Sequence, residues 1–261
     1  MKNIILLSLQ IMFLNIRPII TKKIFLDLGD VIIYTFGSDQ EDKSSVNPFF
    51  GIIGNKVKKE LNLKLRNEYI NFLISIYGQD PASGLPLIYR PWQSGEITGY
   101  DFACDVKRKI ETANISGTKK VFYQEVTKFL EPEKLMDSLQ ISKEAIKTIQ
   151  ELQNKNYEIY ILSNWDKESF PLLLEKFADF FATIKPENIV FSGFIGLIKP
   201  DVEFFDYVKS KFKLTTQDLE NSWFIDDRPE NIASAKKSGF NVILHQSWPD
   251  TKKALEEANL L

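Results

Sequence analysis

Cysteine and histidine are almost absent from this 261-residue sequence, which contains one of each, Cys104 and His245. A single cysteine cannot form a disulfide within the chain and excludes a cysteine-rich metal centre. A single histidine excludes a metal centre built from several imidazoles. Any metal bound by this chain must therefore be held by oxygen ligands, which favours Mg²⁺. We interpret Cys104 as a small packing residue of a predicted helix, and His245 as a structural residue.

An excess of charge of one sign is also lacking. The 33 Lys and Arg residues nearly balance the 35 Asp and Glu residues and form no cluster, so nothing indicates binding to nucleic acid. Hydrophobic residues at 44% and charged residues at 26% are typical of a soluble globular enzyme and exclude a disordered tail. The length suits one large domain or a core with a smaller second domain. No feature of the sequence indicates an oligomeric state.

Residues 1–22 form an apolar extension. Lys2 precedes an apolar stretch over 4–14, which Arg17 and Pro18 follow. The stretch is short for a membrane span, and no small-x-small cleavage site follows it. Two interpretations stay open: an extension packed on the core of a cytoplasmic protein, and a signal or anchor that exports the protein or ties it to a membrane. Membrane association is expected only through this segment.

Short apolar strands alternate with amphipathic helices in residues 23–37 and 141–261. The expected strands cover 24–26, 157–162, 189–191, 223–225 and 241–244. The expected helices cover 142–155 (with Ser142 as N-cap), 167–181, 202–212 and 229–238. This pattern predicts an α/β fold with a parallel sheet covered by helices on both faces. Helical spacing dominates residues 38–140, which predicts an inserted, all-helical cap domain.

Residues able to carry out chemistry follow the predicted strands. They are Asp27 with Asp30, Ser163 with Asn164, Lys199 before Pro200, and Asp226 with Asp227. In an open parallel sheet, ligands bind beyond the carboxyl ends of the strands.

Together these residues suit phosphoryl transfer. A carboxylate can attack phosphorus and form an aspartyl phosphate, which divides a difficult hydrolysis into two steps. The phosphate repels the carboxylates, at a cost of about 4 kcal/mol per pair of like charges ~4 Å apart at an effective dielectric near 20. A divalent cation removes this cost and polarises the phosphoryl oxygens. Lysine adds a positive charge, and a serine hydroxyl donates a hydrogen bond to a phosphate oxygen.

Taken singly, these features have ordinary structural explanations, because an Asp after a strand is more often a turn residue or helix N-cap than a nucleophile. In combination they resemble the four motifs of the haloacid dehalogenase-like superfamily. The matching stretches are 25–32 (FLDLGDVI), 161–164 (ILSN), 196–201 (GLIKPD) and 224–232 (FIDDRPENI). Residues 94–98 (SGEIT) resemble the subgroup that includes sugar-phosphate phosphatases with a small helical cap.

The resemblance implies a magnesium-dependent phosphatase with Asp27 as nucleophile and metal ligand. Gly29 is expected to offer its backbone carbonyl to the metal, and Asp226 and Asp227 to complete the Mg²⁺ site. It also implies a Rossmann-like sheet in which the strands of the first, second and fourth motifs lie side by side.

The remaining roles concern the substrate. By resemblance, Ser163 and Asn164 contact the phosphate or substrate, and Lys199 holds the phosphate and the nucleophile together. The implied substrate is a small phosphorylated metabolite, for example a sugar phosphate.

Gly29 departs from the pattern of most phosphatases in this superfamily, which carry an Asp there to protonate the leaving group and later activate water. General acid–base catalysis typically contributes about 10²–10⁴-fold, so the glycine predicts a slower enzyme. Asp30 lies one residue further on. Because the subgroup that this chain resembles often has glycine at the same position, the change need not abolish turnover.

Two alternatives stay open. A 2-haloacid dehalogenase shares the nucleophile but usually has an aromatic residue at the position of Gly29 and lacks the acid pair, so Asp226 and Asp227 favour the phosphatase. A binding or regulatory protein that kept the fold without turnover is the other alternative. Trp92 and Trp165 are candidates for lining a substrate cavity, although core packing is the favoured interpretation for both.

Overall fold

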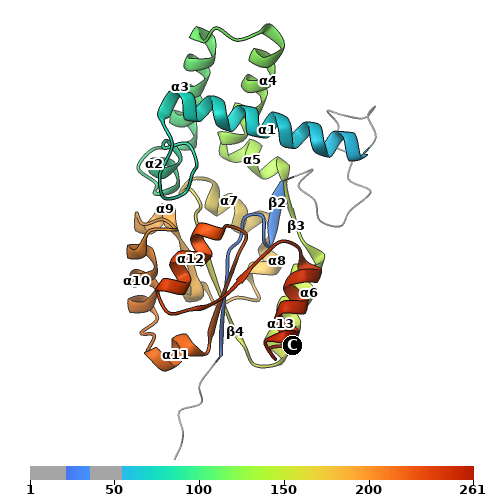
Figure 1. Ribbon diagram of the computed structural model, residues 1–261, viewed down its shortest axis with the longest axis vertical. Coiled ribbons are helices and arrows are strands. Elements are labelled where there is room, and N and C mark those ends of the chain that lie inside the picture. The colour runs from blue at the N-terminus through green and yellow to red at the C-terminus, as the bar shows by residue number, and fades with distance from the viewer. Residues whose placement is uncertain (1–21, 36–54) are drawn as a thin grey trace, which may run out of the picture.

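A five-stranded parallel sheet forms the centre of the computed structural model, which describes residues 22–35 and 55–261 (Figure 1). From edge to edge the strands are β5 (Ile189–Phe191), β4 (Glu158–Ser163), β1 (Lys23–Leu26), β6 (Ser222–Asp226) and β7 (Asn241–Leu244). Leu26 of β1 lies opposite Ile161 of β4 and Ile225 of β6. The strands of the first, second and fourth motifs therefore lie side by side, as the resemblance implied.

Helices cover both faces of the sheet, which confirms the predicted α/β class. On one face lie α6 (Lys143–Asn154), α7 (Ser169–Lys176), α8 (Ala178–Phe181) and α13 (Trp248–Glu257). On the other face lie α10 (Val202–Lys211), α11 (Thr216–Glu220) and α12 (Pro229–Lys237). Shorter helices connect the layers, namely η3 (Pro186–Asn188) and α9 (Ser192–Ile195).

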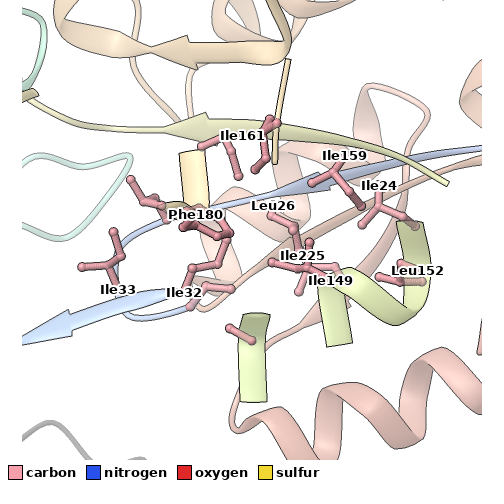
Figure 2. Close-up of a cluster of buried hydrophobic side chains, with 14 of the residues drawn as sticks. Ile24, Leu26, Ile32, Ile33, Ile149, Leu152, Ile159, Ile161, Phe180 and Ile225 are labelled. Atoms are coloured by element: carbon pink, nitrogen blue, oxygen red, sulfur yellow. The ribbon is translucent and has the colours of Figure 1, made fainter. Parts of the chain in front are cut away.

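Side chains along β1 alternate between the two cores. Ile24 and Leu26 pack into the cluster that α6 and α13 cover (Figure 2), whereas Phe25 packs into the cluster under α10 and α12. All three side chains are fully buried. Burial of such a side chain contributes about 1.5–3 kcal/mol, so a shift of one residue in strand register would lose this contribution on both faces.

Between β2 and β3, the described residues from 55 onward are mostly helical and lie beyond one end of the sheet, at the top of Figure 1. Their helices are α1 (Asn55–Tyr77), α2 (Tyr89–Gln93), α3 (Gly99–Thr112), α4 (Gly117–Thr127), η2 (Lys128–Leu130) and α5 (Pro132–Ser138). This helical insert has a hydrophobic cluster of its own, in which Leu73, Phe102 and Val106 are buried. The domain boundaries at 38 and 140 and the role of a cap stay predictions.

Two short strands missing from the sequence-based prediction join the insert to the sheet. β2 (Ile33–Thr35) pairs antiparallel with β3 (Leu139–Ile141), and Ser142 N donates to Ile32 O at 2.9 Å. Ser142 caps α6 as expected, because its side chain accepts a hydrogen bond from Ala145 N.

Two other expectations were wrong in detail. The single helix predicted over 167–181 is broken at Phe177, between α7 and α8. Cys104 is exposed rather than packed, because α3 turns Phe102, Ala103 and Val106 towards the insert's core and Cys104 away from it. The apolar extension of residues 1–22 lies, up to residue 21, outside the described residues. None of the described helices combines the length and apolar character that a membrane span requires.

Candidate active site

The carboxyl ends of two adjacent strands, β1 and β6, bring the predicted acidic residues together. Asp27 directly follows β1, and its backbone N–H donates to Ile225 O of β6 at 2.9 Å. Asp226 is the last residue of β6, and Asp227 follows it. Carboxylate oxygens of the three aspartates lie within 4.8 Å of one another.

The ε-ammonium of Lys199 lies between two of these carboxylates. Its Nζ is 2.9 Å from Asp27 Oδ1 and 2.6 Å from Asp226 Oδ2, and the lysine is only 2% exposed. Burial alone would lower the pKa of Lys199, but the adjacent Asp226 and Asp27 charges outweigh it and raise the pKa above its ordinary value. The lysine is therefore a fixed positive charge beside the predicted nucleophile.

Asp27 and Asp227 hold protons more tightly than ordinary aspartates, because their pKa values are raised. Burial raises the pKa of Asp27 to about 6, with the Lys199 charge opposing the shift and the Asp226 charge adding to it. Burial, followed by the charges of Asp27, Asp226 and Asp30, raises the pKa of Asp227 to about 8. A divalent cation bound among these hard oxygen donors would offset the repulsion, so the three aspartates fit a Mg²⁺ site.

Asp226 is oriented by donors from the helix that follows it. Asn231 of α12 donates from Nδ2 to Asp226 Oδ1 at 2.9 Å and Oδ2 at 3.0 Å, and Arg228 N donates to Oδ1 at 2.9 Å. With Lys199, these contacts give each oxygen of the fully buried Asp226 carboxylate two hydrogen-bond donors. We assigned no role to Asn231 from the sequence, although it lies within the fourth motif.

Asn164 holds the backbone of Lys199. Its Oδ1 accepts from Lys199 N and its Nδ2 donates to Lys199 O, each at 2.8 Å. The predicted contact of Asn164 with substrate stays a prediction. Ser163, the last residue of β4, is 1% exposed and lies on the strand next to the one that leads to Asp27.

Gly29 and Asp30 lie in the turn after Asp27. A Cβ placed on Gly29 would meet no atom within 4 Å, so the turn has room for a side chain there. Asp30 is exposed and has a positive φ of 54°. Its charge is close enough to Asp227 to raise the pKa of Asp227.

The remaining candidates have packing roles. His245 is 4% exposed, its Nδ1 lies 2.8 Å from Thr251 Oγ1, and burial lowers its pKa to about 4. Trp165 donates from Nε1 to Ser169 Oγ at 2.8 Å. The Trp92 ring packs against Tyr89 and Phe102 in the insert.

Comparison with known proteins identifies the family. Residues 59–239 match the family model of haloacid dehalogenase-like hydrolases, and the chain belongs to this family. A predicted HAD-like family hydrolase from Porphyromonas gingivalis has the same fold, with a TM-score of 0.54 and 20% identity over 90% of this chain and 98% of that one.

Two further proteins are similar to this chain. A HAD family enzyme from Bacteroides thetaiotaomicron, in complex with magnesium and inorganic phosphate, has a TM-score of 0.52 and 18% identity over 88% of this chain and 98% of that one. Drimenol cyclase drtB from Aspergillus calidoustus is 30% identical over 112 residues, which are 42% of this chain and 20% of that protein. The chain thus spans about a fifth of the length of this curated relative.

Proposed function

We propose that this chain is a magnesium-dependent phosphatase that hydrolyses a small-molecule phosphomonoester, such as a sugar phosphate, through an aspartyl phosphate on Asp27. The observation that carries the proposal is the position of Asp27. Its carboxylate lies at the end of β1, 2.9 Å from the buried Lys199 ammonium and within 4.8 Å of the carboxylate oxygens of Asp226 and Asp227. This arrangement supports the proposal, because it brings together a carboxylate that can attack phosphorus, a cation that can bind phosphate and an acid pair that can bind a metal.

In the first step, an Asp27 carboxylate oxygen attacks phosphorus, the bond from phosphorus to the ester oxygen breaks, and the alcohol leaves with a proton from solvent or substrate. In the second step, water attacks the phosphorus of the acyl phosphate and the bond from phosphorus to the Asp27 oxygen breaks, which restores the carboxylate. Inorganic phosphate leaves with the protons of the water, one of which it can pass to solvent. Lys199 balances charge on the phosphoryl oxygens in both steps. Mg²⁺ held by Asp27, Asp226, Asp227 and the Gly29 carbonyl would supply further electrostatic stabilisation of the transferring group.

The test is hydrolysis of an aryl phosphate, with Mg²⁺ and with a chelator, by the wild type and by Asp27→Asn. Asp206→Asn, on an exposed aspartate of α10 that pairs with Lys209, is the matched control. We expect turnover that requires Mg²⁺, disappears in Asp27→Asn and persists in Asp206→Asn.

Gly29 favours a second candidate, a binding protein of the same fold without turnover. It predicts that the folded wild type binds Mg²⁺ and inorganic phosphate but hydrolyses neither the aryl phosphate nor any member of a panel of natural phosphomonoesters. Turnover that Asp27→Asn abolishes would exclude this candidate.

A further inference from the structure

Arg90, at the base of the helical insert, forms a bidentate ion pair with the core beside the catalytic lysine. Its guanidinium binds both carboxylate oxygens of Asp201, with Nη1 3.3 Å from Oδ1 and Nη2 on Oδ2. Asp201 is two residues after Lys199, and its backbone N–H donates to Ile198 O at 3.0 Å. This hydrogen bond closes the turn over residues 198–201, which carries Lys199.

Asp201 is the N-cap residue of α10, but its side chain does not cap that helix. An aspartate at this position ordinarily accepts hydrogen bonds from the first-turn N–H groups of its own helix. Here the carboxylate binds the insert through Arg90 instead. This exchange of a local contact for a contact between the insert and the core indicates that the pair does more than stabilise α10.

The insert holds Arg90 in place through a second carboxylate. Asp80 is 3% exposed and accepts hydrogen bonds from Ser83 Oγ at 2.5 Å, Ala82 N at 3.3 Å and Arg90 Nη1 at 3.2 Å. The guanidinium therefore lies between one carboxylate of the insert and one of the core. Its charge is balanced by these two acids, which makes it a poor site for an additional anionic group of the substrate.

The same loop of the insert also contacts the metal-binding side of the site. Arg228, the residue after Asp227, donates from Nη2 to Ser83 O at 2.6 Å and pairs with Glu230. Residues 80–90 thus touch both the turn that carries Lys199 and the turn that carries Asp227.

We infer that Arg90 is a positioning residue, which fixes the turn that carries Lys199 through its ion pair with Asp201. Docking of the insert on the core and alignment of Lys199 are therefore coupled. The structural part of this inference stands on the contacts alone, whereas its catalytic consequence rests on the proposed phosphatase function. Because the pair uses the planar fork of an arginine, a lysine at this position can supply the charge but not both hydrogen bonds.

A double-mutant cycle tests the inference on the full chain, with Arg90→Ala, Asp201→Ala and the double variant, and with Arg90→Lys as the conservative change. Lys252→Ala is the control, because Lys252 pairs with Glu151 at 2.7 Å at comparable exposure, between two helices of the core. The readouts are kcat and KM for an aryl phosphate with Mg²⁺, thermal stability, and hydrogen–deuterium exchange of residues 196–202.

We expect each single alanine variant to lower kcat by about tenfold or more with little change in KM, since a small misplacement of a catalytic group is enough for such a loss. The double variant should lose no more than either single one, and Arg90→Lys should recover part of the activity. Exchange of residues 196–202 should accelerate in Arg90→Ala, although the substitution lies in the insert, and should not change in Lys252→Ala.

Other outcomes would overturn the inference. A rise in KM for Arg90→Ala with an unaffected Asp201→Ala would mean that Arg90 binds substrate directly. Loss of thermal stability at unchanged kcat would mean that the pair is only structural. If the wild type hydrolyses no phosphomonoester, the proposed function fails, and the exchange of residues 196–202 then decides alone: unchanged exchange in Arg90→Ala rejects the positioning role.

Discussion

The side chain of Asn164 binds both backbone groups of Lys199, accepting from its N–H and donating to its carbonyl at 2.8 Å. Asn164, the residue that follows β4, thus fixes the position of the Lys199 backbone. From there the Lys199 ammonium contacts Asp27 and Asp226. A lysine side chain is long and rotamer-rich, so a rigid backbone anchor reduces the number of positions that its charge can adopt.

We predict that Asn164→Ala lowers kcat for an aryl phosphate by about tenfold or more, since the Lys199 backbone loses both contacts and the ammonium loses its position. Loss of the two hydrogen bonds should also cost about 1–3 kcal/mol of unfolding free energy. Asn241→Ala is a matched control, because Asn241 donates to the carbonyls of Glu220 and Ser222 at the opposite end of the sheet. Equal loss of kcat in both variants would show that the effect is one of stability.

Gly29→Asp is expected to increase activity. The position has no positive φ, and a Cβ there would contact no atom within 4 Å, so the backbone accepts a side chain without a clash at Cβ. An added general acid should accelerate hydrolysis of an alkyl phosphate by up to about 10²-fold, and of a nitrophenyl phosphate much less, because the nitrophenolate leaves without needing a proton. Gly29→Asn is the control of equal size. A similar gain in Gly29→Asn would contradict a proton-transfer explanation.

Much of the site could be predicted from the sequence because its signals are local. Asp27 and Asp226 each follow an apolar run of three residues or more, and the resemblance to a known family implied that the strands of the first, second and fourth motifs are neighbours. The structure then places these residues at one edge of the sheet.

The contacts that support the site could not be predicted, because their partners lie far apart in the sequence. Asn164 and Lys199 are 35 residues apart, and Arg90 and Asp201 are 111 residues apart. The pairing of β2 with β3 has the same cause, since a strand of three residues is too short to show a period and acquires its conformation from a distant partner.

The effect of Mg²⁺ on stability should depend on pH. The folded pKa values of about 8 for Asp227 and about 6 for Asp27 lie above the ordinary value of 3.8. Without metal, folding therefore gains stability as pH falls from about 8 towards 4, and this contribution is lost as pH rises through the folded pKa values. Mg²⁺ competes with these protons, so the increase in Tm caused by Mg²⁺ should grow between pH 5.5 and pH 8.5.

Thermal unfolding with Mg²⁺ and with a chelator across this pH range provides the measurement. Asp227→Asn should reduce both the Tm increase and its pH dependence, since the group with the most strongly raised pKa has been removed. A Tm increase that is the same at every pH, or the same in Asp227→Asn, would show that Mg²⁺ binds elsewhere.

The junction between α2 and α9 should tolerate no side chain at Gly95. A Cβ on Gly95 would lie 2.4 Å from the backbone carbonyl oxygen of Gly193, and the residue has a φ of 78°. Two other glycines separate the effect of the steric clash from the effect of the positive φ. Gly78 has a φ of 84° with no atom within 4 Å of an added Cβ, and Gly117 has an open Cβ position without a positive φ.

Urea denaturation of the three alanine variants should therefore give a graded series. Gly117→Ala should be neutral or stabilising by up to about 1 kcal/mol, since alanine restricts the unfolded chain. Gly78→Ala should cost about 1–2 kcal/mol for its left-handed conformation. Gly95→Ala should cost more than Gly78→Ala, because the insert must also move away from the Gly193 carbonyl. If the Gly95 and Gly78 variants are equally stable, the insert and the core are not in close contact at this junction.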